Sequence, residues 1–255
     1  MQEDPVISVE GVSHFFHKAG HSTEVLHDIS FAVSKGEFVS VIGTSGSGKS
    51  TLLYMMAGFL NPTAGSVKHH GEIITKPNPD RGIVFQSDAV FPWMSVQHNV
   101  EFGPRMKGIS KSERRRIAQD YLARVGLTGS EKLLPRQLSG GMRKRVDVAR
   151  TFANRPEVLL MDESFGALDV QTKERLQTEL LQLWEAERTT AIFVTHDIEE
   201  SILLADRVVI LRGSPGTVVG EITVPFPRPR TADIKRTPEF QQLRRDLTDL
   251  LAGSD

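Results

Sequence analysis

The sequence predicts an α/β fold built around a mostly parallel sheet. Short apolar runs rich in β-branched residues alternate with segments of helical periodicity, which is typical of strand–helix–strand units. A glycine-rich loop lies directly between an apolar strand and a helix, where such folds hold phosphate groups. A length of 255 residues suits one α/β domain with small subdomains, so we expect a single copy of the fold.

The elements follow from these patterns in chain order. Apolar, β-rich runs at residues 6–12, 29–33 and 38–42 favour three strands. An Ala- and Leu-rich stretch at residues 49–58 then favours a helix, and residues 81–86 favour another strand. The phosphate-binding chemistry is therefore expected where the third strand meets the first helix.

The middle of the chain is predicted to be mostly helical, followed by buried strands. Ser110 and Glu113 form a capping-box pattern, and Gly126 is expected to end the helix that they begin. The later strands are expected at residues 158–162, 191–195 and 208–211. After a Pro- and Arg-rich linker, a short amphipathic helix is expected, with Phe240, Leu243, Leu247, Leu250 and Leu251 on its apolar face.

Charge and cysteine content exclude several classes of protein. The formal net charge is -1, so the positive footprint of a nucleic-acid-binding protein is missing and no nucleic-acid partner is expected. The absence of cysteine excludes disulfides and thiolate metal sites. The N-terminus lacks a secretory signal, and no apolar run approaches the roughly 20 residues of a membrane span. We therefore expect a cytoplasmic protein.

The glycine-rich loop matches the phosphate-binding pattern G-x-x-x-x-G-K-[ST]. Backbone N–H groups can surround a phosphate at the positive helix end, Lys49 supplies a mobile cation, and the Ser50 hydroxyl can ligate Mg²⁺. A plain glycine-rich turn is the weaker interpretation, because a strand precedes the loop directly. The residues expected to bind nucleotide here are Gly43, Thr44, Ser45, Gly46, Ser47, Gly48, Lys49, Ser50 and Thr51.

Two further motifs carry chemistry. The apolar run at residues 158–161 ends in Asp162, which can hold a metal ion through water, and Glu163, which can polarise an attacking water. By periodicity alone, this could equally be a strand that leaves the core. Leu138-Ser139-Gly140-Gly141-Met142 predicts a second anion-binding helix start capped by Ser139, although alone it could be only a capped turn.

The phosphate loop, the Leu-Ser-Gly-Gly motif and the Asp-Glu strand, in this order, resemble the nucleotide-binding domains of ABC transporters over about residues 6–224. The resemblance implies an ATP hydrolase with ATP and Mg²⁺ as cofactors. The implied P-loop NTPase cassette has a RecA-like core, an N-terminal antiparallel β subdomain and a helical subdomain at about residues 87–155. Residues 225–255 would form the linker and the C-terminal helix.

The same resemblance implies roles for further residues. Gln86 matches the glutamine that touches Mg²⁺ and senses the permease, Asp169 lies in the loop that crosses the dimer interface, and His196 matches the histidine that contacts the γ-phosphate. Phe16 matches an adenine-stacking aromatic residue, with Phe15 as the competing assignment. The implied catalytic residues are Glu163, His196 and Lys49. The residues of the Leu-Ser-Gly-Gly motif that would touch the nucleotide are Ser139, Gly140 and Gly141. The implied metal ligands are Ser50, Gln86 and Asp162.

Two residues depart from the family pattern, and one cluster has two interpretations. Ser164 stands where related importers often have Pro, and Asp147 introduces charge into the helix after the Leu-Ser-Gly-Gly motif. Neither departure removes a catalytic group. The cluster at residues 90–93, Val-Phe-Pro-Trp, either packs under the helical subdomain or receives a short cytoplasmic helix of a permease, and Trp93 distinguishes the two.

At finer grain, residues 91–93, 138–143, 165–169 and 195–200 look like importer ATPases for nitrate, sulfonate and taurine. That group implies a second ATP-binding subunit in a homodimer, an integral membrane permease and an extracytoplasmic solute-binding protein. The cassette would act at the cytoplasmic face of the membrane on a small solute such as nitrate, a sulfonate, taurine or a pyrimidine precursor. An exporter ATPase and a non-transport ABC ATPase are the alternatives.

Overall fold

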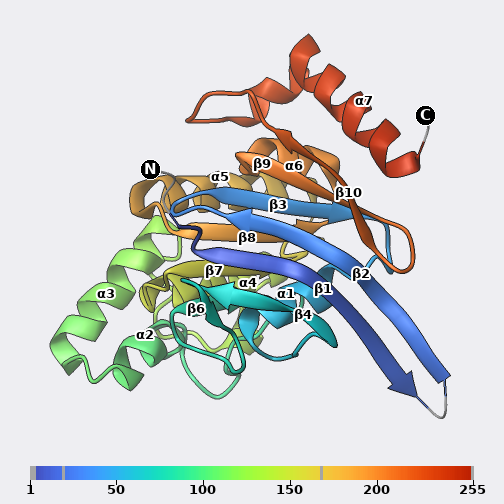
Figure 1. The fold of residues 1–255 in the computed structure, drawn as a ribbon. Coiled ribbons are helices and arrows are strands. Elements are labelled where there is room, and N and C mark those ends of the chain that lie inside the picture. The colour runs from blue at the N-terminus through green and yellow to red at the C-terminus, as the bar shows by residue number, and fades with distance from the viewer. Residues whose placement is uncertain (1–3, 19–20, 167–168, 254–255) are drawn as a thin grey trace. The chain divides into compact units, whose positions relative to one another are not determined.

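The computed structural model describes residues 4–18, 21–166 and 169–253, which form two compact units. The first unit comprises the chain up to residue 78 together with the chain from residue 188 onward. The second unit spans residues 79–187 and is therefore an insertion in the sequence of the first. Both units combine strands with helices, so the predicted α/β class is confirmed (Figure 1).

The first unit contains two groups of paired strands. One is an antiparallel sheet of order β2-β1-β4-β5, and the other has the order β10-β9-β3-β8. Its elements are β1 (Ile7–Lys18), β2 (His21–Val33), β3 (Phe38–Gly43), α1 (Lys49–Ala57), β4 (Ala64–His69), β5 (Glu72–Ile73), β8 (Thr190–Thr195), α6 (Ile198–Leu204), β9 (Arg207–Arg212), β10 (Thr217–Thr223), the 3₁₀ turn η2 (Ala232–Arg236) and α7 (Pro238–Ala252).

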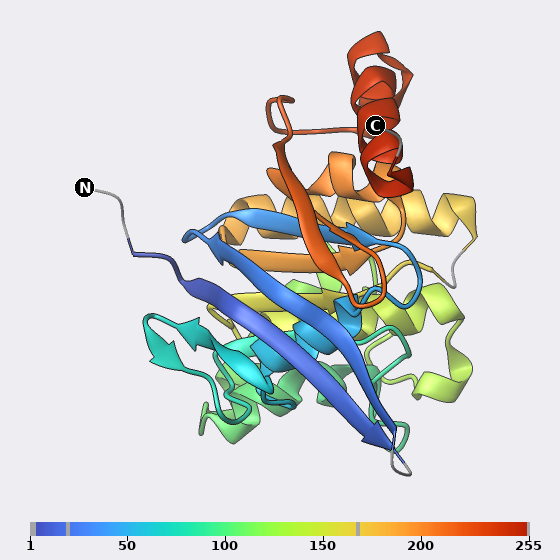
Figure 2. The same cartoon turned by 45° about the vertical axis from the view of Figure 1, so that its right-hand side comes forward.

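Strands β1 and β2 are longer than the sequence predicted. The two strands pair antiparallel from Ile7↔Val33 as far as Lys18↔His21, and Figure 2 shows them running side by side in blue. Their outer halves are rich in polar residues, which gave no apolar signal in the sequence. Backbone hydrogen bonds between paired strands do not depend on that signal, so the pairing continues beyond the buried part.

Strand β3 organises the functional end of the first unit. Its six residues are all buried, and it pairs in parallel with β8 on one side and β9 on the other. The register places Ile42 opposite Thr195, so β3 and β8 end together. Ligands of parallel α/β sheets bind at the carboxyl ends of the strands. The phosphate loop follows the carboxyl end of β3, and His196 follows that of β8.

The C-terminal helix α7 packs on the same unit through its apolar face, as predicted. Phe240 and Leu247 are fully buried in a cluster with Ile202 of α6 and Ile210 of β9. The other predicted apolar residues of α7 pack against this cluster.

The second unit consists of two parallel strands and a group of helices. Strand β6 pairs with β7 in a register that places Val84 opposite Met161. Serine side chains cap α2, α3 and α4, and Ser110 caps α3 as predicted. The elements are β6 (Arg81–Val84), α2 (Val96–Met106), α3 (Lys111–Arg124), the 3₁₀ turn η1 (Pro135–Gln137), α4 (Gly140–Ala153), β7 (Val158–Asp162) and α5 (Val170–Glu187). No helix within the described ranges has the length and apolar character needed to cross a membrane.

Candidate functional site

The glycines of the phosphate loop give its backbone a shape that other residues would not adopt. Gly46 and Gly48 both have φ of 84°, in the left-handed region that L side chains rarely occupy. A Cβ on Gly48 would lie 2.5 Å from Leu26 Cδ2, and a Cβ on Gly43 would lie 2.5 Å from Ser47 Oγ. The loop therefore turns tightly between β3 and α1, with its backbone close to the Ser47 side chain and to Leu26 of β2.

The start of α1 suits an anion. Its N-cap is Gly48, which offers no side chain to the first N–H groups of the helix, and the first turn has no acidic residue. The Ser47 hydroxyl is buried and has no hydrogen-bond partner among the described residues. Backbone N–H groups without a side-chain cap, together with the Ser47 hydroxyl at the positive helix end, fit the phosphate groups of a nucleotide.

Lys49 is folded back over this loop. Its ammonium group donates to the carbonyl oxygens of Gly43 at 2.9 Å and Thr44 at 3.0 Å, and the side chain is buried. The cation is thereby held beside the backbone donors at the helix start. The loop, the lysine and the helix start thus lie together within the first unit, as a phosphate-binding site requires.

His196 is held at the neighbouring strand end by a rigid junction. It is exposed and stands between Thr195, the last residue of β8, and Asp197, which caps α6 by accepting from the N–H groups of Glu199 and Glu200. The Thr195 hydroxyl also donates to the buried Glu200 carboxylate at 2.8 Å. This capping fixes the backbone on both sides of His196.

Phe16 offers an exposed aromatic face on β1. Its side chain is 44% exposed, and its ring meets the His14 ring edge-on at a centroid distance of 4.7 Å. The competing Phe15 is only partly exposed, and its N–H donates to the Thr63 hydroxyl at 3.1 Å. Phe16 is thus the better placed of the two to stack on a base, and its role stays a prediction.

The second unit brings Gln86 and Glu163 together. The parallel register of β6 and β7 places the residues after both strands at the same edge, and the Gln86 amide donates to Glu163 Oε2 at 3.1 Å. Asp162 at the end of β7 is buried, whereas Glu163 is half-buried. Glu163 has φ of 37°, a left-handed conformation that costs a non-glycine residue on the order of 1–3 kcal/mol and concentrates at functional sites.

The Leu-Ser-Gly-Gly motif begins α4 as predicted. Ser139 is exposed and its hydroxyl accepts from the Met142 N–H at 3.3 Å. A Cβ on Gly141 would lie 2.4 Å from Thr172 Cγ2, so this position requires glycine for close packing against α5. Gly140 meets no such obstacle closer than 3.7 Å.

Asp169 stabilises the start of α5. Its carboxylate accepts from the Thr172 N–H at 3.0 Å, and hydrogen bonds from the backbone and side chain of Thr172 lower the pKa of Asp169. Ala167 and Leu168 of the same predicted interface loop lie outside the described residues. Ser164, the first departure from the family pattern, is buried, and its hydroxyl has no hydrogen-bond partner within the described ranges.

Comparison with known proteins decides the family. The family model described as ABC transporter matches residues 26–166. The chain is also 49% identical over 249 residues to the bicarbonate transport ATP-binding protein CmpD of Synechocystis sp., covering 96% of this chain and 88% of that protein. The chain belongs to the ABC transporter family. The cassette is further 45% identical over 247 residues to the nitrate import ATP-binding protein NrtD of the same organism, covering 94% of the cassette and 92% of that protein.

Solved structures agree with this assignment. The cassette resembles the dimeric structure of the ATP-binding cassette MJ0796 in a post-hydrolysis state bound to ADP and Pi, with a TM-score of 0.76 and 30% identity over 86% of this chain and 99% of that one. A second dimeric structure of MJ0796 gives a TM-score of 0.77 and 31% identity over the same shares. The cassette is an ATP-binding and ATP-hydrolysing subunit, as the sequence predicted.

Sequence reasoning missed two cations of α4, Lys144 and Arg143, that contact the segment around Gln86. Lys144 is buried and donates to the carbonyl oxygens of Phe85 at 2.7 Å and Gln86 at 3.1 Å. Arg143 pairs with Asp88 at 2.6 Å. The only signal in the sequence is that these cations follow the Leu-Ser-Gly-Gly motif on the same helix, and nothing local shows which segment they contact.

Proposed function

We propose that this cassette powers the import of a small oxyanion through a separate membrane permease. The observation that carries the proposal is the similarity to CmpD and NrtD along nearly the whole cassette, at 49% and 45% identity. The names of these two relatives give bicarbonate and nitrate, which are both small, planar, singly charged oxyanions. An extracytoplasmic solute-binding protein would deliver the anion, and the cassette would act at the cytoplasmic face of the membrane.

The proposed site residues divide the work of hydrolysis. Residues 43–51 bind the phosphates, Phe16 stacks on adenine, and Ser50, Gln86 and Asp162 hold Mg²⁺, which neutralises charge on the phosphate oxygens. Glu163 orients and polarises the attacking water, while Lys49 and His196 stabilise charge on the γ-phosphate. The unpartnered Ser47 hydroxyl and the uncapped start of α1 support the phosphate assignment.

We propose further that two copies of the cassette pair head to tail. In such a dimer Ser139, Gly140 and Gly141 of one copy would complete the nucleotide site of the other. The dimeric solved structures of the MJ0796 cassette support this arrangement. The exposure of Ser139 at the start of α4 is consistent with a role toward a partner.

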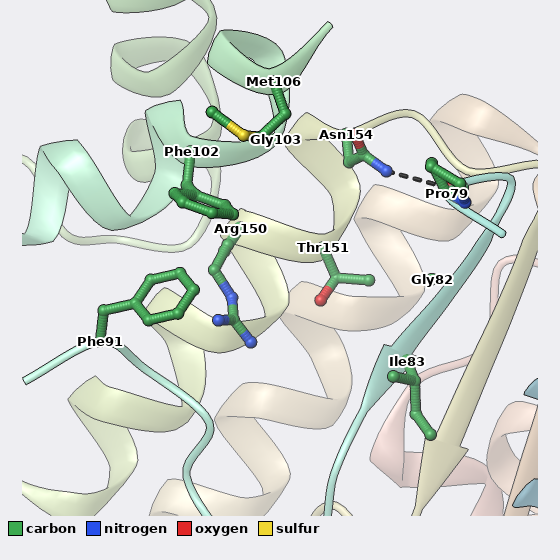
Figure 3. A pocket seen from close by; sticks show the side chains of 10 residues that line it. All are labelled: Pro79, Gly82, Ile83, Phe91, Phe102, Gly103, Met106, Arg150, Thr151 and Asn154. Atoms are coloured by element: carbon green, nitrogen blue, oxygen red, sulfur yellow. Dashed lines mark hydrogen bonds between the residues drawn. The ribbon is translucent and has the colours of Figure 1, made fainter. Parts of the chain in front are cut away.

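A pocket in the second unit supports the proposed permease contact. It has a volume of about 300 Å³ and is lined by residues of β6, α2 and α4 and by Phe91, as Figure 3 shows. Phe91, Phe102 and Met106 make its wall largely apolar, and Arg150 adds one cation. Trp93 lies next to this wall, with its ring 5.7 Å from that of Phe91, and is 72% exposed. An exposed aromatic anchor beside an apolar pocket suits a short helix of a permease.

Substitution of Trp93 tests the permease contact. Trp93→Asp should abolish transport and permease association, because it places a charge where an apolar contact is needed, while the isolated cassette keeps its MgATP affinity and basal hydrolysis. The matched control is Ile73→Asp, which alters another exposed apolar residue, 63% exposed, in the first unit. A sharp fall in the thermal midpoint of Trp93→Asp, or an intact permease complex, would exclude the docking assignment.

Purification of the whole transporter tests the proposed solute. The tagged cassette would be isolated with its membrane partner, reconstituted in proteoliposomes and assayed for ATP-dependent uptake of bicarbonate, nitrate and an alkanesulfonate. Uptake of one of the two planar oxyanions supports the proposal. Export of a lipid or drug, or the absence of any permease together with DNA or ribosome association, would favour the alternative functions.

A further inference from the structure

Helix α4 holds the segment that carries Gln86 through side chains from two of its turns. Lys144 donates to the carbonyl oxygens of Phe85 and Gln86 at 2.7 and 3.1 Å. Two turns later, Arg150 donates to the carbonyl oxygen of Ala89 at 2.6 Å. Lys144 and Arg150 are each three residues from Asp147, so each neighbours Asp147 along the helix. Their long side chains place one donor at each end of residues 85–89.

Lys144 is unusual for a lysine because the residue is only 3% exposed. Burial lowers the pKa of Lys144, and the carboxylates of Asp147, Asp88 and Asp162 oppose that shift. A buried lysine is costly unless its donors are used, and here two of them reach adjacent backbone carbonyls. The arrangement fixes the backbone of Gln86 itself.

Asp147 pairs with Arg150 and interacts electrostatically with Lys144. It is 0% exposed, and its Oδ1 accepts from Arg150 at 2.6 Å, while Oδ2 has no hydrogen-bond partner within the described ranges. Burial raises the pKa of Asp147, and the charges of Arg150 and Lys144 act against that rise. The charge that departs from the family pattern is therefore one that orients Arg150. The guanidinium of Arg150 also lies over the Phe91 ring at 5.3 Å, and both residues face the pocket in Figure 3.

We propose that the buried residues Lys144 and Asp147, together with the half-buried Arg150, form a brace that holds residues 85–91 so that Gln86 meets Glu163. Gln86 is exposed, so its side chain depends on the backbone beneath it for the 3.1 Å contact with Glu163. The three residues are positioning residues for hydrolysis, and they join that contact to the pocket beside Phe91. The inference rests on the proposed roles of Gln86 and Glu163.

Steady-state kinetics of the full-length cassette test the brace. Lys144→Met and Asp147→Asn should lower kcat about tenfold, because misplacement of a positioning group slows the chemical step. KM and the dissociation constant for MgATP should stay within about twofold, since the phosphate loop is untouched. Lys144→Arg, which retains a donor to the two carbonyls, should recover most of the lost kcat. A rise in KM that accompanies the fall in kcat, with no recovery by Lys144→Arg, would overturn the proposal.

The matched control is Arg145→Met, on the same helix. Arg145 is also buried, and it forms an ion pair with Glu179 of α5 at 3.1 Å. Within the described residues, the hydrogen bonds from α4 to residues 85–89 come from Lys144 and Arg150 and not from Arg145. Its loss should lower the thermal midpoint about as much as Lys144→Met does while leaving kcat near that of the wild type. Equal loss of kcat in Arg145→Met would show that α4 acts only through stability.

A double-mutant cycle with Gln86→Ala separates the brace from the site assignment. If Lys144 acts through Gln86, then adding Lys144→Met to Gln86→Ala should cause no further loss of kcat. Additive losses would overturn the brace while leaving Gln86 in the site. A Gln86→Ala variant with wild-type kcat would overturn both the site assignment and the brace.

Discussion

The backbone conformation of Glu163 supports the catalytic role proposed for this residue. It follows β7 directly, in a left-handed conformation that a glutamate rarely adopts. Its carboxylate accepts a hydrogen bond from the Gln86 amide. Strain of this kind persists only where the surrounding structure holds it, and the buried strand before Glu163 provides that support. The strained backbone and the hydrogen bond from Gln86 together position the carboxylate.

Glu163→Gln tests the assignment at this scale. The amide keeps the size of the carboxylate but cannot accept a proton, so turnover should fall by roughly 10²- to 10⁴-fold. MgATP binding, measured by equilibrium titration, should remain near that of the wild type because the phosphate loop is unchanged. Glu174→Gln, an exposed carboxylate on α5, is the control. Near-normal turnover in Glu163→Gln would falsify the role of Glu163.

Helices α1 and α4 begin with different caps. Helix α1 begins with Gly48 and has no side-chain cap at its first N–H groups, which supports the proposed phosphate role. Helix α4 begins with Ser139, whose hydroxyl already occupies the Met142 N–H. The two predicted anion-binding helix starts are therefore not equivalent, because only α4 has a side-chain cap.

Helix α7 gives a prediction about stability. Phe240 is fully buried and its ring stacks on Phe226 at a centroid distance of 6.0 Å. Phe240→Ala should lower the free energy of unfolding by about 3–5 kcal/mol, since it removes a buried aromatic ring and leaves a cavity. Urea denaturation would measure this, with Gln242→Ala on the exposed face of α7 as a control expected within about 0.5 kcal/mol of the wild type. A loss in Phe240→Ala no larger than in the control would show that α7 is not part of the stable core.

At the scale of the whole molecule, the candidate residues are divided between the two units. The phosphate loop, Phe16 and His196 belong to the first unit, whereas Gln86, Asp162 and Glu163 belong to the second together with the Leu-Ser-Gly-Gly motif. Within each unit the parallel strand register alone brings the relevant loops to one edge. The proposed head-to-tail pairing adds a requirement for a second copy.

Trapping of the dimer tests that requirement. Glu163→Gln should accumulate an MgATP-bound dimer, because binding proceeds while hydrolysis is blocked, and addition of Ser139→Arg should prevent the dimer by filling the partner's site. Light scattering after size-exclusion chromatography would measure the mass. Ser110→Arg in the same background controls for loss of a serine cap, since Ser110 caps α3 at the same 3.3 Å distance. A double mutant that still dimerises would contradict the head-to-tail arrangement.

The sequence by itself determined the α/β class, the phosphate loop, the strand ending in Asp162 and Glu163, the capped start of α4 and the apolar face of α7. Each is a contiguous pattern whose chemistry acts over a few residues, such as a glycine turn or a serine cap. Only the tertiary structure showed that Trp93 is exposed, that β1 and β2 extend beyond their apolar parts, and that Lys144 holds the Gln86 segment. The contacts Gln86–Glu163 and Lys144–Phe85 join residues 77 and 59 positions apart, so no local pattern encodes them. Packing decides them, because the register of β6 and β7 and the face of α4 bring these side chains within hydrogen-bond distance.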